Sequence, residues 1–256
     1  MVIPSPRGEW FCERLGRHTV VTRRAAGRPF HVVVEQTRAD CIHPCTVDDI
    51  ARMLSLVPAR DLDKLELVLL RQPKRKEQIL SPVWGRLRYA ADIAKFQGPV
   101  IILEAVAASG VALNWSRKLD PGDQEELERL RADADRVEES KRGYRLHFSV
   151  DAVRYLQLFR TFPHELGHWV HYLDRVERPS ALAPDRWDTL QEAYKAIPKQ
   201  EREAFAHRYS DHTKQALEAM GHVPFPRILD ARSLGRDGLR RGDFDATAKK
   251  AVPEAE

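Results

Sequence analysis

The stretch TFPHELGHWVHYL occupies residues 161–173 and contains the pattern HExxH. Pro163 is favoured in the first turn of a helix, where the N–H that proline lacks would have no partner within the helix. Gly167 weakens a helix by about 1 kcal/mol relative to alanine, which suggests that a strand or loop packs closely there. The stretch predicts an amphipathic helix, because four apolar residues recur at i, i+3, i+4 and i+7: Leu166, Trp169, Val170 and Leu173.

The two histidines of the HExxH pattern predict a metal site. His164 and His168 lie one helical turn apart on nearly the same face, offset by about 40°. Both imidazoles can therefore reach a single ion. Glu165 can project beside that ion and accept a proton from water. The alternative interpretation is a core helix with two hydrogen-bonded histidines and a surface glutamate.

A third ligand is expected downstream, because catalytic zinc usually takes three protein ligands and keeps a fourth position for water. Asp174 stands where extended HExxHxxGxxH/D motifs place that ligand, but His171 replaces the glycine at which those motifs turn. The preferred alternative is a glutamate on a second helix. Helical stretches at 191–197 and 199–220 carry three candidates: Glu192, Glu201 and Glu203.

The form HELGH followed by Glu-Arg-Glu-Ala-Phe-Ala resembles the gluzincin metallopeptidases, and within them the small bacterial ImmA/IrrE-type group. The resemblance covers about residues 160–215, and HExxH is its specific part. It implies a zincin-like α+β fold, in which a small mixed sheet is followed by a metal-binding helix pair, and a Zn2+ cofactor.

Within this resemblance His164, His168 and Glu203 are the implied metal ligands, and Glu165 is the implied general base. The chain departs from the family in two ways. The full Glu-Ala-x-x-Phe-Ala spacing is not kept, and His207 stands where thermolysin-like enzymes have an aspartate. These departures leave open which of the three glutamates is the ligand. They also leave open which group supports the ligands.

Other polar residues near the expected site are candidates for stabilising the oxyanion that forms when water attacks a carbonyl. Tyr209 is selected as a catalytic residue beside Glu165, with His207 and Tyr194 as alternatives. His171 is offset by about a quarter turn from the face of the two ligand histidines, so we interpret it as a supporting or surface residue.

The composition is typical of a globular protein: 43% of the 256 residues are hydrophobic and 31% are charged. The net charge of +4 is spread along the chain and does not favour a nucleic-acid partner. The basic run at 71–76 is interpreted as a solvated turn, with phosphate contact as the alternative. The sequence shows neither a secretory signal nor a membrane span, and three cysteines make no disulfide framework, so we expect a cytoplasmic protein.

The organisation of the chain predicts a zincin-like domain over 1–230, with a sheet-containing part at 1–150 and a helical metal-binding part at 151–230. A helix with Thr46 as N-cap should run to about Leu56. A highly charged surface helix is expected over 121–141 and a mobile tail over 231–256. Strands are expected at 30–35, 65–70, 84–89, 99–104 and 111–115.

The family arrangement implies that an edge strand pairs with an extended substrate, and the segments 84–90 and 99–104 are the two candidates.

One further group could hold a structural metal. Cys41, His43 and Cys45 lie within five residues, with Cys12 or His18 as a possible fourth ligand. The alternative is that these cysteines are small core residues.

Two classes of function follow from the sequence. The first is a zinc-dependent hydrolase acting on a peptide or protein substrate, with Glu165 as the base. The second is a binding or regulatory protein that keeps the zincin scaffold with weak or no turnover. The intact Glu165 favours the first, because a pure binding module needs no base at that position.

Overall fold

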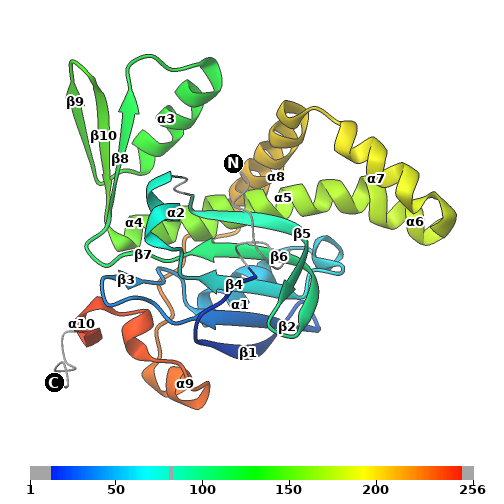
Figure 1. Ribbon diagram of the computed structural model, residues 1–256, viewed down its shortest axis with the longest axis horizontal. Coiled ribbons are helices and arrows are strands. Elements are labelled where there is room, and N and C mark those ends of the chain that lie inside the picture. The colour runs from blue at the N-terminus through cyan, green and yellow to red at the C-terminus, as the bar shows by residue number, and fades with distance from the viewer. Residues whose placement is uncertain (1–12, 81–82, 250–256) are drawn as a thin grey trace.

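Five strands form a mixed sheet at the centre of the computed structural model, which describes residues 13–80 and 83–249 (Figure 1). Their order is β1-β2-β4-β6-β5. β2, β4 and β6 run parallel, and the two outer strands run antiparallel to their neighbours. The strands are β1 (His18–Ala25), β2 (Arg28–Glu35), β4 (Leu67–Arg71), β5 (Gly85–Ile93) and β6 (Phe96–Glu104).

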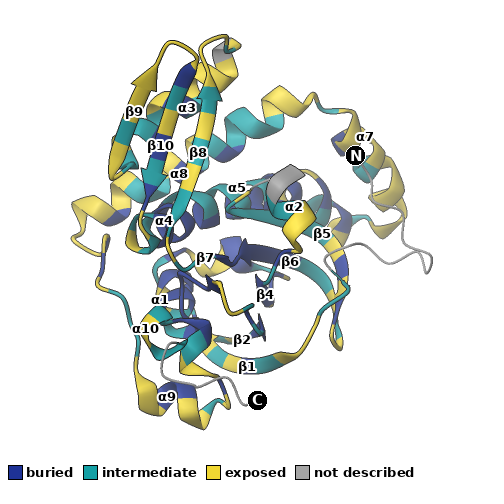
Figure 2. Ribbon diagram, turned by 60° about the vertical axis from the view of Figure 1, so that its left-hand side comes forward, coloured by how far each residue is buried: buried dark blue, intermediate teal, exposed yellow. Residues whose placement is uncertain are grey.

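Both faces of the central strands are covered, and this explains their continuous apolar sequences. Every residue of β4 is buried, and buried residues concentrate in the inner strands in Figure 2. β5 is an edge strand whose residues are mostly half-buried. Of the two segments proposed for substrate pairing, 84–90 therefore lies at an edge. The proposal for 99–104 is wrong, because β6 pairs with a strand on each side.

Helix α1 (Val47–Leu56) covers one face of this sheet and begins as the sequence predicts. Thr46 and Asp49 form a reciprocal capping box at its first turn. Asp49 is fully buried and accepts two hydrogen bonds from Arg154, at 2.8 and 3.0 Å. This ion pair joins α1 to helix α4 (Val150–Leu156), which leads into the segment that carries the HExxH pattern.

A second, smaller sheet stands beside the first, with α3 packed on one face (Figures 1 and 2). We call residues 111–148 the accessory unit. Its strand order is β8-β10-β9, and it has its own apolar core around Leu127, Leu130 and Leu146. The elements are β8 (Val111–Ser116), α3 (Pro121–Asp133), β9 (Arg136–Ser140) and β10 (Gly143–Phe148).

The charged helix predicted over 121–141 is correct only to Asp133. Residues 136–140 form β9, which pairs with β10 and places Val137 against the accessory core. Its other residues are exposed and charged or polar, so the segment carries almost no apolar periodicity by which to recognise a strand. The pairing with β10 decides its conformation.

The chain from 150 to 182 is almost continuously helical, with π-helical turns at 157–161 and 173–177. Such turns often mark functional segments. The helices of this part are α5 (Phe162–Tyr172), α6 (Arg178–Leu182), α7 (Trp187–Ala196) and α8 (Lys199–Ala219). Shorter elements are β3 (Cys41–Ile42), η1 (Ala59–Leu62), α2 (Arg75–Leu80), β7 (Val106–Ala107) and η4 (Pro184–Arg186).

The prediction of a mobile tail from residue 231 is wrong for 231–249. This segment forms α9 (Ala231–Arg236), η5 (Arg241–Asp243) and α10 (Ala246–Lys249). Phe244 is fully buried in the main core, and Asp243 accepts hydrogen bonds from the backbone N–H and hydroxyl of Thr37 at 3.0 and 2.9 Å. A few isolated residues anchor the segment, so its sequence lacks the regular spacing of apolar residues by which a helix is recognised. Residues 250–256 lie outside the described residues.

The basic run at 71–76 begins with a buried arginine. Arg71, predicted within a solvated turn, has a side chain only 3% exposed and pairs with Glu77 and Glu104. That part of the prediction is wrong, because the end of β4 is covered by α2.

Within the described ranges, none of the helices has the length and apolarity needed to cross a membrane.

Candidate metal centre

Helices α5 and α8 pack closely enough to bring their backbones into contact at Gly167. A Cβ built on Gly167 would lie 3.0 Å from Ala206 Cα and 3.1 Å from Tyr209 Cβ. The glycine predicted to face a strand or loop therefore faces a second helix. Glycine at 167 and alanine at 206 together allow the approach, so the face of α5 that carries the histidines meets α8 directly.

Three polar atoms from these helices converge on one point. His164 Nε2 and His168 Nε2 are 3.2 Å apart. Glu203 Oε2 lies 3.3 Å from the first nitrogen and 3.4 Å from the second. The three side chains are 18%, 13% and 36% exposed, so the cluster is open to solvent on one side.

The size of this triangle fits a zinc ion. Ligand atoms about 2.0–2.1 Å from a tetrahedral centre are separated by about 3.3–3.4 Å along each edge. The observed edges of 3.2–3.4 Å match that spacing. Two imidazole nitrogens and one carboxylate oxygen are also the donor types that zinc prefers in catalytic sites. Within the described part of the chain, these residues form the one group of three with metal-ligand spacing.

The other residues considered as third ligand lie away from this cluster. Asp174 pairs with Arg178 on the next helical turn and is 48% exposed. Glu192 and Glu201 are exposed on α7 and at the start of α8. The helix continues through His171, so the chain does not make the turn that an aspartate ligand at 174 would need.

Glu165 lies beside the ligand atoms and is held by the edge strand. Its Oε2 accepts a hydrogen bond from the Leu87 N–H of β5 at 2.7 Å. Burial raises the pKa of the Glu165 carboxyl, while the neighbouring imidazoles of His164 and His168 oppose that shift. In contrast, hydrogen bonds from the two histidines lower the pKa of Glu203. The surroundings of the two carboxylates thus shift their pKa values in opposite directions.

His207 lies next to the cluster, one turn after Glu203 on α8. Its ring centroid is 4.5 Å from that of His164. Burial lowers the pKa of His207 to about 4, so its imidazole is neutral at pH 7. Its Nδ1 is 2.6 Å from Nη1 of Arg129, which comes from α3 of the accessory unit. Sequence reasoning missed Arg129, because nothing in a charged surface helix indicates which of its residues reaches another element.

The remaining candidates each contact another partner. The Tyr209 hydroxyl donates to Asp61 Oδ2 of η1 at 2.8 Å. The Tyr194 hydroxyl is 3.0 Å from that of Tyr89, a β5 residue that sequence reasoning also missed. His171 is buried and stacks on Phe205 with ring centroids 4.4 Å apart, as a packing residue behind the ligands.

The second metal group considered from the sequence does not assemble among the described residues. Cys41 Sγ contacts Arg38, His43 Nε2 lies 2.7 Å from the Glu35 carbonyl oxygen, and Cys45 Sγ faces the Arg154 carbonyl. Each therefore points to a different partner. Cys12 lies outside the described residues, and His18 Nδ1 contacts the Gly16 carbonyl at 2.9 Å.

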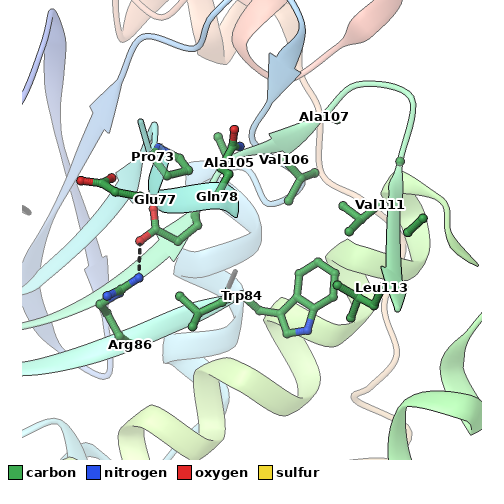
Figure 3. A pocket seen from close by; sticks show the side chains of 14 residues that line it. Pro73, Glu77, Gln78, Trp84, Arg86, Ala105, Val106, Ala107, Val111 and Leu113 are labelled. Carbon is green, nitrogen blue, oxygen red and sulfur yellow. Dashed lines mark ion pairs between the residues drawn. The ribbon is translucent and has the colours of Figure 1, made fainter. Parts of the chain in front are cut away.

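A separate cavity of about 320 Å³ lies at the start of β5 (Figure 3). Trp84 and Arg86 line it, and Arg86 pairs with Glu104 at 3.3 Å. Side chains alternate between the two faces of a strand, so the side chain of Leu87 lies on the other face. None of the three ligand residues lines this cavity.

Comparisons with protein-family models, with curated proteins and with solved structures gave no match.

Proposed function

We propose that this protein is a zinc-dependent metallohydrolase, and that its substrate is a peptide or protein. The observation that carries the proposal is the triangle of His164 Nε2, His168 Nε2 and Glu203 Oε2, with edges of 3.2–3.4 Å. The edges match the distances between ligand atoms in tetrahedral zinc coordination. Glu165 lies next to the three ligand residues and occupies the position of the general base in the HExxH pattern. The zincin-like arrangement, with a sheet followed by a metal-binding helix pair, is part of the same proposal.

His164, His168 and Glu203 would hold the ion, which supplies a Lewis acid and makes water more acidic. Glu165 then accepts a proton from the attacking water and passes it to the leaving amine. The Leu87 N–H fixes one oxygen of the carboxylate, so the other serves as proton acceptor. Burial favours this role, because a base whose pKa is raised toward the working pH accepts a proton more readily.

The edge strand favours a peptide over a small ester or amide. β5 is an outer strand of the five-stranded sheet, and its Leu87 touches the proposed base. An extended chain that adds to such an edge is bound through its own backbone N–H and C=O groups. The carbonyl nearest Leu87 would then lie beside Glu165.

The first test is metal content. Purified protein should contain one zinc ion per chain by elemental analysis, and Glu203→Ala should lose it. The absence of any stoichiometric transition metal from the parent protein would refute the proposal.

The second test is turnover. A peptide library digested with and without 1,10-phenanthroline should show cleavage that the chelator abolishes. Glu165→Gln should keep the zinc and lose the cleavage, because Glu165 is a base and not a ligand. Stoichiometric zinc without cleavage of any peptide would favour the alternative class, a binding protein on the same scaffold.

A further inference from the structure

The accessory unit contacts the metal centre through Arg129. Arg129 lies on α3, and its Nη1 is 2.6 Å from Nδ1 of His207 on α8. The helix that carries Arg129 is itself fastened to the main domain. Arg160 donates to the Arg129 carbonyl at 3.1 Å and pairs with Asp133 at 2.7 Å. Arg160 thus holds α3 at Arg129 itself and at Asp133, one turn further along the helix.

The contact with Arg129 decides which nitrogen of His207 carries the proton. A guanidinium has only N–H donors and no acceptor. Nδ1 of His207 must therefore accept, which leaves it without a proton. A ring without a proton on Nδ1 carries its one N–H on Nε2. Arg129 turns His207 into a hydrogen-bond donor at its far nitrogen.

The ring of His207 lies next to one of the proposed ligands. His207 follows Glu203 by one turn of α8, and its ring lies 4.5 Å from the ring of His164 with an angle of 51° between their planes. His207 is nevertheless outside the group of mutually close ligand atoms formed by His164, His168 and Glu203. His207 therefore lies beside the ligand cluster without being one of its three ligands.

We propose that Arg129 holds His207 as the Nε2–H tautomer, and that His207 donates a hydrogen bond to the oxyanion that forms at the scissile carbonyl. His207 is then a catalytic residue and Arg129 a positioning residue supplied by the accessory unit. The inference rests on the proposed hydrolase function. It also assigns the accessory unit a role, because without α3 the tautomer of His207 would not be fixed.

Kinetics and metal content test the donor role of His207. His207→Ala should keep one zinc per chain and lower kcat by about 100-fold with little change in KM, the usual effect of removing one oxyanion donor. His207→Gln retains an amide donor and should recover part of the lost kcat. A His207→Ala protein with parent kcat, or one without zinc, would overturn the proposal.

Arg129 is tested against a neighbour on the same helix. Arg129→Ala should keep the zinc and lower kcat by about tenfold, the effect expected for a group that orients a catalytic residue. The matched control is Arg131→Ala, because Arg131 pairs with Glu128 and stacks over Tyr144 away from His207. The control should leave kcat at the parent value. An equal loss in both variants would mean that Arg129 acts only through the stability of α3.

A spectroscopic measurement separates this inference from the hydrolase proposal. Long-range 1H–15N correlation spectra of histidine-labelled metal-free protein report the tautomer of each ring. His207 should be the Nε2–H tautomer in the parent and a mixture in Arg129→Ala. A parent His207 protonated at Nδ1 would overturn the role of Arg129. A parent protein that neither binds zinc nor cleaves peptides would refute the hydrolase and the donor role, while the spectra still decide the Arg129 contact.

Discussion

The substitution Gly167→Ala tests whether the contact between α5 and α8 sets the geometry of the proposed metal centre. The new methyl group would lie 3.0 Å from Ala206 Cα and 3.1 Å from both Ala206 O and Tyr209 Cβ. Two of these neighbours are backbone atoms, which cannot rotate away. The helices must therefore separate by a few tenths of an ångström, a shift comparable to the tolerance of about 0.2 Å in metal–ligand distances.

Two opposing effects decide the size of the change in stability. Overpacking a close contact costs about 1–3 kcal/mol. Alanine is a better helix former than glycine by up to about 1 kcal/mol. We expect a net loss of about 1 kcal/mol in the free energy of unfolding of the metal-free protein, or about 2–4 °C in Tm. We also expect zinc to bind roughly tenfold more weakly, by analogy with changes that disturb ligand orientation.

The assay is thermal unfolding of the metal-free protein together with a competitive zinc titration. Gly235→Ala on α9 is the control, because a Cβ there would have no neighbour within 4 Å. It should raise the unfolding free energy by a few tenths to about 1 kcal/mol and leave zinc affinity unchanged. If Gly167→Ala stabilises the protein as the control does and binds zinc as tightly as the parent, the two helices do not touch at this point.

Three further predictions follow from the site and the core. Replacing Glu203 with alanine should weaken zinc retention on dialysis markedly, whereas Asp174→Ala, which removes an exposed ion pair, should leave it near the parent value. Zinc removal should lower Tm by several degrees, since a ligand at a hundredfold excess over Kd stabilises by about 2.7 kcal/mol, and hydrogen exchange should rise over 161–220 but not in the central sheet. Burial lowers the pKa of His43 to about 4 from an ordinary 6.5, so its neutral form in the folded state contributes stability that is lost as pH falls through that window. Urea unfolding should show up to about 3 kcal/mol less stability at pH 4 than at pH 7 from this residue. His43→Gln should make the free energy of unfolding depend less steeply on pH.

Features governed by neighbouring residues were predictable from the sequence. The capping box of α1 is visible as Thr46 followed by Asp49, and the apolar runs of β2 and β4 identify buried strands. The α+β class is confirmed. In α5, helical periodicity alone places His164 and His168 on one face, and the structure adds Glu203 to them.

Features governed by distant residues were not predictable. Arg129 meets His207 across 78 positions, and Tyr209 meets Asp61 across 148. Neither partner can be chosen by local spacing, because the packing of whole elements brings them together. The same reason explains why 231–249 was taken for a tail: its burial depends on isolated residues such as Phe244.

The anchoring of 231–249 on the first part of the chain has a consequence for synthesis on the ribosome. Thr37 and its acceptor Asp243 stand 206 positions apart, and Arg23 and Asp237 stand 214 apart. The N-terminal strands therefore emerge long before the segment that covers them has been translated. Contacts of such sequence separation form slowly, and uncovered apolar strands are prone to aggregate. We expect the nascent chain to rely on chaperones until Phe244 has left the ribosome.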